Sequence, residues 1–392
     1  MNESATLKMT QIAREKKEKG VDVISLSIGE PDFDTPEYIK NAAIDAINQT
    51  GMSAPTHYPP VPGYDSLRDA ICRKLKQDNN LIYERKNIVV SAGAKHSLMN
   101  VILSIVDRGD EVIIPTPYWV SYRDMVEFAE GVAVEIPCGI KDDFKVTPEK
   151  IKEKITQYTR AIMLNSPSNP SGKLYTQKEL KAIADVLANY PDIIILSDEI
   201  YEHINFTNEQ CQSIAQFDNI KDRVVIINGV SKGYAMTGWR IGYIAAPKYI
   251  ADAVIKLQGQ CTSGICGISQ KAAEAALNGG LDSIKKMTEI FKQRRDLVYI
   301  LLKDIPGLKT NLPDGAFYFF PDVSEFIGKS YNGNIINDSD EMALSILQYA
   351  DVATVGGISF GLPQCLRLSY AASEKDLKEA MRRLKKYFSE FD

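Results

Sequence analysis

The chain has 392 residues, of which 44% are hydrophobic and 25% are charged, and its formal net charge is -5. It has no long basic run, which argues against nucleic acid as the main partner, because neutralising phosphates requires clustered Lys and Arg. No apolar stretch reaches the roughly 18 residues of a membrane span, and the first residues lack the apolar core of a signal peptide, so we expect no membrane association and a cytoplasmic location.

The cysteines and histidines show no metal-ligand spacing. The six cysteines form no CxxC pair, and only three histidines accompany them,. Cys261 and Cys266 are close in sequence, but disulfides are rare in cytosolic proteins. We therefore expect reduced thiols and no metal.

Short apolar runs rich in Val and Ile alternate with amphipathic stretches between about residues 86 and 246. This alternation predicts a mainly parallel sheet covered by helices. Thr176 and Glu179 form a predicted capping box, and Thr35 and Thr147 each precede a proline, which is typical of a helix start. The apolar runs begin near residues 88, 112, 161, 193, 224 and 241.

The pattern changes after a long helical stretch near 281–303. LPDGAFYFFPDV and CLRLSYA are predicted strands, and Ser373 begins a last helix with apolar residues at helical spacing. The chain length exceeds what one core usually needs, so we expect a large domain packed against this smaller α+β unit, with a ligand cleft between them.

Four segments follow predicted strands and combine small, polar and charged residues. In open α/β sheets, ligands bind beyond the carboxyl ends of the strands, where these segments would converge. The segments are SAGAKHSLMNV (91–101), NSPSNPSG (165–172), SDEIY (197–201) and GVSKGYAMTGWRIGY (229–243).

Five residues in these segments indicate a charged ligand. Gly93 and Ala94 precede a helix whose first N–H groups can hold a phosphate. Asp198 ends a very apolar strand, so its carboxylate should face a cation. Lys232 stands among small and hydroxyl residues, where a partly desolvated amine can form a Schiff base, and Arg240 can bind a phosphate or carboxylate. Singly, Lys232 could be a surface lysine and Asp198 a helix cap, but the four segments together favour one site.

These residues resemble the fold-type-I, class I aminotransferases that use pyridoxal 5'-phosphate, and within them the aspartate aminotransferase group. The likeness covers nearly the whole chain and is most specific at Ser231, Lys232 and GWRIG (238–242). It implies an α/β fold, with a large domain built on a mainly parallel seven-stranded sheet between helices, and a smaller α+β domain formed by both chain ends. The implied parts are an N-terminal arm with part of the small domain (1–38), a large cofactor-binding domain (39–285) and a C-terminal small domain (286–392).

The resemblance also implies roles for residues around the cofactor. Lys232 would be the Schiff-base lysine and the base that moves the substrate proton, while Asp198 would keep the pyridine nitrogen protonated. Asn169 and Tyr201 would hydrogen-bond the phenolic oxygen, and Trp119 would stack on the ring. The remaining implied cofactor contacts are Gly93, Ala94, Lys95, Ser231 and Arg240 around the phosphate.

Tyr58 matches a tyrosine that reaches the phosphate of the neighbouring subunit, so the resemblance implies a homodimer with shared active sites. Arg367 would bind the substrate α-carboxylate in a bidentate manner, with a backbone contact from Gly29. Lys95 is the candidate for a distal carboxylate. The implied substrate-binding residues are Gly29, Lys95, Trp119, Asn169, Arg367, Ser4 and Thr6.

The implied reaction is reversible, ping-pong transfer of an amino group from L-aspartate to 2-oxoglutarate. KLQGQCTSGICG lacks the arginine of one aspartate branch, and SAT (4–6) with Lys95 resembles another branch. Asn2 and Glu3 stand where that branch often has Lys-Pro, associated with prephenate use, and GGISFG (356–361) departs from a common Pro-Gly, which could shift substrate preference. Aromatic, prephenate or broad-range transamination and a lyase reaction on the same cofactor remain alternatives. A transcription regulator would need a DNA-binding domain, but only about 30 residues precede SIGEPDF,.

Overall fold

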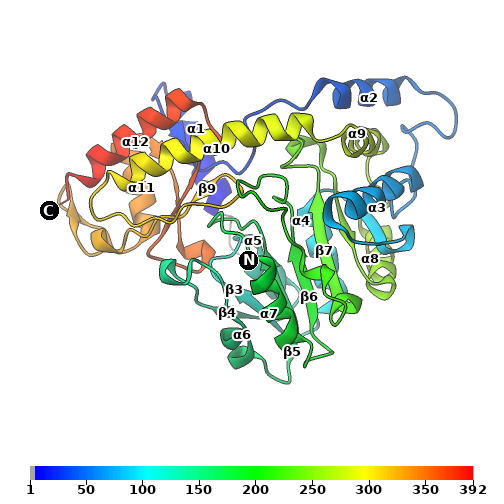
Figure 1. Cartoon of the computed structure of the whole chain (residues 1–392). Helices are drawn as coiled ribbons and strands as arrows, with labels where there is room; N and C mark the ends of the chain where they lie inside the picture. The colour runs from blue at the N-terminus through cyan, green and yellow to red at the C-terminus, as the bar shows by residue number, and fades with distance from the viewer. Residues whose placement is uncertain (1–4, 392) are drawn as a thin grey trace.

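The computed structural model describes residues 5–391. A twisted sheet with helices on both faces forms one part of the molecule, and a second unit, which contains both α1 (Ala5–Glu18) and α12 (Glu374–Phe388), lies beside it (Figure 1). The strand order in the sheet is β2-β8-β7-β6-β5-β3-β4. The strands are β2 (Ile88–Ser91), β3 (Glu111–Pro115), β4 (Val132–Ile136), β5 (Thr159–Asn165), β6 (Ile194–Asp198), β7 (Val224–Gly229) and β8 (Gly242–Ala245).

The predicted mainly parallel, seven-stranded sheet is confirmed. Strand β8 pairs antiparallel with both β2 and β7, whereas the pairs from β7 to β4 are parallel. All six predicted apolar runs become strands. The seventh strand, β4, had no such run because VAVEI lies at the sheet edge, where only its last residue is buried.

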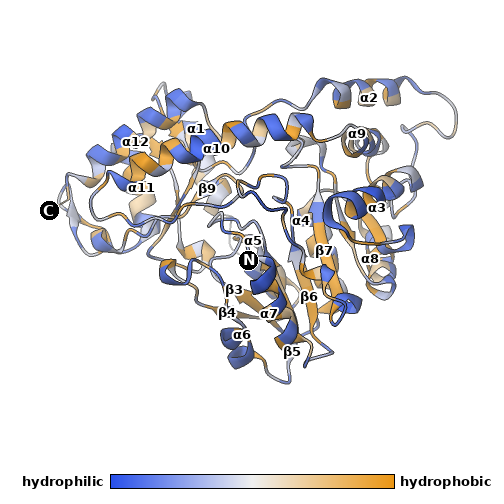
Figure 2. Ribbon diagram, in the orientation of Figure 1, coloured by the Kyte–Doolittle hydropathy of each residue, from blue (hydrophilic) through white to orange (hydrophobic). Residues whose placement is uncertain are grey.

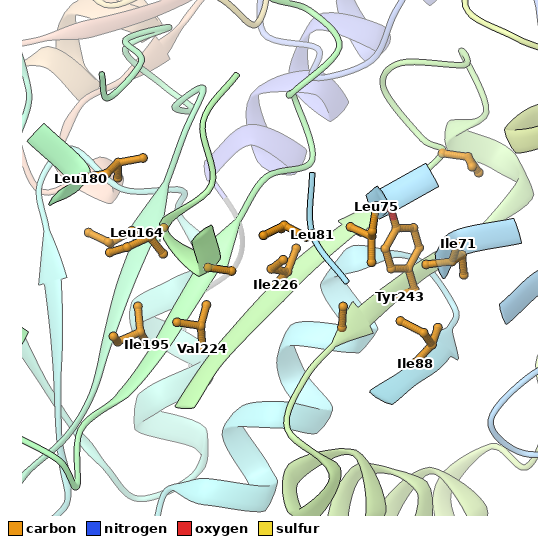
Figure 3. Packing of buried hydrophobic residues seen from close by; sticks show 14 of the residues in the cluster. Ile71, Leu75, Leu81, Ile88, Leu164, Leu180, Ile195, Val224, Ile226 and Tyr243 are labelled. Atoms are coloured by element: carbon orange, nitrogen blue, oxygen red, sulfur yellow. The ribbon is translucent and has the colours of Figure 1, made fainter. Parts of the chain in front are cut away.

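Side chains alternate between the two faces of the sheet, as the two-residue period of a strand requires. Ile195 packs on one face with residues of α2, α3, α6, α7 and α9 (Figure 3), and Leu196 packs on the other with α4, α5 and α8. Figure 2 shows apolar strands inside and polar outer helix faces. These helices are α2 (Glu37–Asn48), α3 (Asp65–Asn79), α4 (Ala94–Ile105), α5 (Ser121–Phe128), α6 (Pro148–Lys154), α7 (Gln177–Leu187), α8 (Lys248–Cys261) and α9 (Gly267–Asn278).

A second core joins the two ends of the chain. Met9 and Leu384 belong to one buried cluster, and Tyr201 from the loop after β6 extends into it. The smaller α+β unit is thus observed, while its boundaries at residues 38 and 285 stay predictions. Its elements are α1 (Ala5–Glu18), β1 (Ile24–Ser25), α10 (Asp282–Lys303), β9 (Tyr318–Phe319), β10 (Ser330–Tyr331), β11 (Asn334–Ile335), α11 (Ser339–Tyr349), β12 (Val352–Ala353), β13 (Val355–Gly356), β14 (Leu366–Ser369) and α12 (Glu374–Phe388).

Three of the four predicted helix starts are confirmed by capping bonds. Thr147, Thr176 and Ser373 each accept a backbone N–H of the first turn,. Thr35 does not cap α2, because its hydroxyl donates to the Ala235 carbonyl. The prediction for Thr35 was therefore wrong, and its hydroxyl instead fastens the chain to the loop after β7. Among the described helices, none combines the length and the apolar character that a membrane crossing requires.

Candidate active site

The carboxyl ends of β2, β5, β6 and β7 lead into one cavity of about 470 Å³. The four segments singled out in the sequence therefore meet as expected for an open α/β sheet. The predicted site residues that line this cavity are Thr6, Gly29, Ala94, Lys95, Trp119, Asn169, Asp198, Tyr201, Ser231, Lys232, Arg240 and Arg367.

One end of the cavity is suited to a phosphate. Gly93 precedes α4 with φ 89°. The first N–H groups of a helix have no partner within it and are therefore available to bind a phosphate. A Cβ on Gly93 would lie 2.2 Å from Nη2 of Arg240, so only glycine lets the guanidinium come this close. Arg240 is itself held by its donation to the Thr237 carbonyl at 2.7 Å. Gly93 thus shapes this end without lining the cavity.

Lys95 follows Ala94 in the first turn of α4. Its Nζ lies 4.7 Å from the centroid of the Trp119 ring. Burial lowers the pKa of Lys95, and the nearby Arg240 charge lowers it further. Next to it, His96 accepts the Ala92 N–H through Nδ1, which is a structural role at the helix start.

Asp198 is a buried carboxylate at the end of β6, with 8% of its surface exposed. Its Oδ2 accepts the Tyr122 hydroxyl at 2.6 Å, and its Oδ1 accepts the Ile200 N–H at 3.2 Å. Burial raises the pKa of Asp198, whereas both hydrogen bonds and the charge of Lys232 oppose this shift. A cation in the cavity would stabilise the charged form.

Lys232 lies in the loop after β7. Its Nζ donates to the Gly29 carbonyl and lies 5.7 Å from the centroid of the Tyr201 ring. Burial lowers its pKa from 10.5 to about 8, although the charge of Glu30 acts in the opposite direction. Near neutral pH, about a tenth of this amine is therefore uncharged and nucleophilic.

Arg367 also lines the cavity and is 1% exposed. It donates to Asn169 Oδ1 at 3.1 Å and to the Ser27 carbonyl at 2.7 Å, and its guanidinium lies between the rings of Tyr318 and Phe360. These acceptors are neutral, and its Nε has no hydrogen-bond partner in the described chain. A buried guanidinium of this kind is suited to a carboxylate ligand.

Sequence reasoning missed three residues that support this site. Tyr122 bonds to Asp198, and Tyr318 shares a 2.8 Å hydrogen bond with the Tyr201 hydroxyl. Asn165 donates to the Asp198 carbonyl. Asn165 could have been found as the first residue of NSPSNPSG, but no sequence signal tells where the tyrosine hydroxyls point.

Among the described residues, Tyr58 is a second predicted site residue, besides Gly93, that does not line the cavity. Tyr58 is 96% exposed in this single chain. Ser4 lies outside the described residues. The roles assigned to the individual site residues stay predictions.

Comparison with known proteins identifies the family of the chain. Residues 21–384 match the family Aminotransferase class I and II. A probable aspartate/prephenate aminotransferase of Rickettsia typhi is 44% identical over 97% of this chain and 95% of its own length. The aspartate/prephenate aminotransferase of Nitrosomonas europaea is also 44% identical, over 97% of this chain and 96% of its own.

Solved structures agree as well. The aspartate aminotransferase of Rhizobium meliloti superimposes with a TM-score of 0.95 at 42% identity, covering 100% of this chain and 98% of that one. The Thermus thermophilus aspartate aminotransferase with maleate gives a TM-score of 0.92 at 37% identity, covering 99% and 97%. With a family match over nearly its whole length, the chain belongs to the class I and II aminotransferases.

Proposed function

We propose that this aminotransferase uses pyridoxal 5'-phosphate and transfers the amino group of L-aspartate to 2-oxoglutarate. The observation that carries the proposal is one cavity lined by the half-buried Lys232 and by the buried Asp198 and Arg367. This set offers an amine for an aldehyde, a carboxylate for a ring cation and a guanidinium for a substrate carboxylate.

The residues present fit this cofactor. The α4 N-terminus and Arg240 provide a phosphate site, whose space a Cβ on Gly93 would fill,. Among the described residues, the buried Asp198 carboxylate has neutral hydrogen-bond donors and no ion pair in direct contact, and a pyridinium nitrogen would supply one. Trp119 and Tyr201 add an aromatic ring and a hydroxyl at the same cavity,.

When bound, pyridoxal phosphate supplies an aldehyde for the amino group and a protonated ring that withdraws electrons. Lys232 attaches the cofactor, gives way to the substrate amine and, as a free amine, then carries the proton from the substrate Cα. Arg367 binds the α-carboxylate and thereby orients the Cα–H bond, and Asp198 holds the proton at the ring nitrogen. Water would release the carbon skeleton as a 2-oxo acid while the amino group stayed with the cofactor, and a second 2-oxo acid would take up this amino group by the reverse path.

The preference for aspartate is supported by a further cation in the cavity, which could bind the second carboxylate of the substrate. The Lys95 ammonium lines it, as does Thr6 of α1. The relatives are named for aspartate, and the Thermus structure contains the dicarboxylate maleate. Prephenate is the second candidate, since the relatives from Rickettsia and Nitrosomonas are also named for it.

Donor competition tests the substrate. The purified enzyme should give a higher kcat/KM with aspartate than with alanine or phenylalanine when 2-oxoglutarate is the acceptor. Lys95→Gln should lower the aspartate-to-alanine ratio about tenfold, because a charge-assisted hydrogen bond is lost, while Lys248→Gln on the exposed face of α8 should leave it unchanged. Faster turnover of aromatic donors, or of the amino acid that prephenate forms on accepting an amino group, would contradict the preference for aspartate. Release of ammonia from a single amino acid would indicate a lyase.

The proposed enzyme is a cytoplasmic homodimer. Tyr58 is almost fully exposed, as expected of a residue that completes a partner's site,. All six cysteines are free, which suits the reducing cytosol,.

A further inference from the structure

Tyr122 is a buried residue that contacts side chains lining the cavity. It is the second residue of α5, is 2% exposed and packs in the core cluster between α4, α5, α8 and the sheet. Asp198 lines the cavity, and the hydroxyl of Tyr122 donates to its Oδ2 at 2.6 Å. The Ile200 N–H donates to the other carboxylate oxygen, Oδ1. The two hydrogen bonds together fix the plane of the carboxylate.

The same tyrosine also holds Trp119. The two rings meet edge to face, with centroids 5.6 Å apart and an interplanar angle of 89°. The backbone N–H of Tyr122 donates to the Trp119 carbonyl at 2.9 Å. One buried residue therefore contacts two side chains that face the cavity, Trp119 and Asp198.

The charge of Asp198 depends on few neighbours. Burial raises its pKa, and the groups that oppose this shift are the Tyr122 hydroxyl, the Ile200 N–H and the Lys232 ammonium. Tyr122 keeps its proton, because burial and the adjacent carboxylate raise its own pKa well above 10. A hydroxyl that only donates stabilises the charged carboxylate.

We propose that Tyr122 is a positioning residue for the reaction, whose hydroxyl holds the Asp198 carboxylate in the orientation and charge with which it retains the proton on the ring nitrogen of the cofactor. This inference rests on the proposed function, because it requires pyridoxal phosphate to be bound. It differs from a packing role, in which the ring of Tyr122 matters and its hydroxyl does not.

Tyr122→Phe removes the hydroxyl and keeps the ring, and Tyr118→Phe is its matched control. Tyr118 stands on the same segment, but its hydroxyl donates to Glu135 at 2.8 Å. The readout is the pH midpoint of the visible absorption of the bound cofactor. A protonated ring nitrogen makes the nearby Lys232 nitrogen less basic. If Tyr122→Phe weakens the hold on the ring proton, the pH midpoint should therefore rise by at least about half a pH unit. The midpoint of Tyr118→Phe should equal that of the unmodified protein.

A cofactor analogue separates the electrostatic role from packing. Pyridoxal phosphate methylated at the ring nitrogen carries a permanent positive charge that needs no retained proton. With the natural cofactor, Tyr122→Phe should slow the single-turnover reaction with aspartate about tenfold relative to the unmodified protein. With the methylated analogue, the ratio of the two single-turnover rates should return to about one, because the ring nitrogen then carries no proton that Asp198 must retain.

The possible results distinguish this inference from the proposed function. An equal deficit with both cofactors would assign Tyr122 a packing role only and overturn the inference. The inference is also overturned if the pH midpoint of Tyr122→Phe equals that of Tyr118→Phe. In that case the proposed function still stands, provided that the unmodified protein binds the cofactor and turns over aspartate. If the unmodified protein binds no pyridoxal phosphate, both fail.

Discussion

Arg367 shows how burial gives a residue its proposed role. Its guanidinium is enclosed by Tyr318 and Phe360, with neutral hydrogen-bond acceptors, so a substrate carboxylate would be its counter-charge. Arg367→Lys keeps the charge but loses the planar fork, and we expect KM for aspartate to rise about thirtyfold. The cofactor affinity of Arg367→Lys should be unchanged. Arg383, which pairs with Asp22 outside the cavity, is the control, and Arg383→Lys should leave KM for aspartate unchanged. An unaltered KM in Arg367→Lys would contradict carboxylate binding by this residue.

Lys232 gives a pH prediction at the same scale. An amine attacks an aldehyde only when it is neutral, and burial lowers the pKa of Lys232 to about 8,. Because the pKa is lowered, the neutral fraction grows as pH rises through about 8 and is nearly complete well below the ordinary lysine range. The rate of covalent cofactor loading, followed by absorbance, should therefore level off above about pH 9. A rate that still climbs near about pH 10.5 would show an ordinary lysine.

Asp198 and Lys232 could be singled out from the sequence because they lie at or just beyond the end of a strand within a recognisable segment, whereas Arg367, inside β14, was found only through the family resemblance. The charge of Asp198 must be compensated inside the fold, and this need is visible from the apolar strand that it ends. Tyr122 and Tyr318 were not predictable, since their ordinary spacing suggests only core packing. Whether a buried hydroxyl has a partner depends on tertiary contacts.

At the scale of elements, close packing of β8 against the start of α4 shapes the phosphate end. A Cβ on Gly242 would lie 2.2 Å from the Ala94 nitrogen, a backbone atom that cannot move without the helix. Gly242→Ala should lower the free energy of unfolding by about 1–3 kcal/mol and weaken cofactor binding. Gly238→Ala, four residues earlier, meets no atom within 4 Å and is the control. Chemical denaturation and a cofactor titration measure both effects, and equal behaviour of the two variants would contradict the packing explanation.

The departure at GGISFG also has a local cause. A Cβ on Gly356 would lie 1.9 Å from Oδ1 of Asp340 at the start of α11. Asp340 occupies the space that a side chain at position 356 needs, so the proline common in the family does not fit here. Sequence alone marks such a position as unusual but does not show which distant residue fills it.

At the scale of the whole molecule, the proposed homodimer would complete the site with a residue from a second copy of the chain. The α/β class, the parallel sheet and the smaller unit were predictable because hydrophobic periodicity reports burial within one chain. The environment of Tyr58 was not predictable in this way, since 96% of its surface is exposed in the single chain and its proposed contact is with a second copy.

Hybrid dimers test this arrangement. Lys232→Ala and Tyr58→Ala subunits should each be weakly active alone at limiting cofactor. After mixing and subunit exchange, one site of each hybrid combines a native Lys232 with the partner's native tyrosine, so activity should rise severalfold, toward about one native site per hybrid. Without any rise, despite exchange shown by mass spectrometry, Tyr58 would not act across subunits.

The central claim is that pyridoxal phosphate attaches to Lys232. The most direct measurement is borohydride reduction of the purified protein after incubation with pyridoxal phosphate, followed by peptide mass mapping. The cofactor mass should appear on the peptide that contains Lys232, and aspartate added before reduction should prevent it from being trapped there. Labelling of other lysines with Lys232 unmodified, or no labelling at all, would contradict the claim.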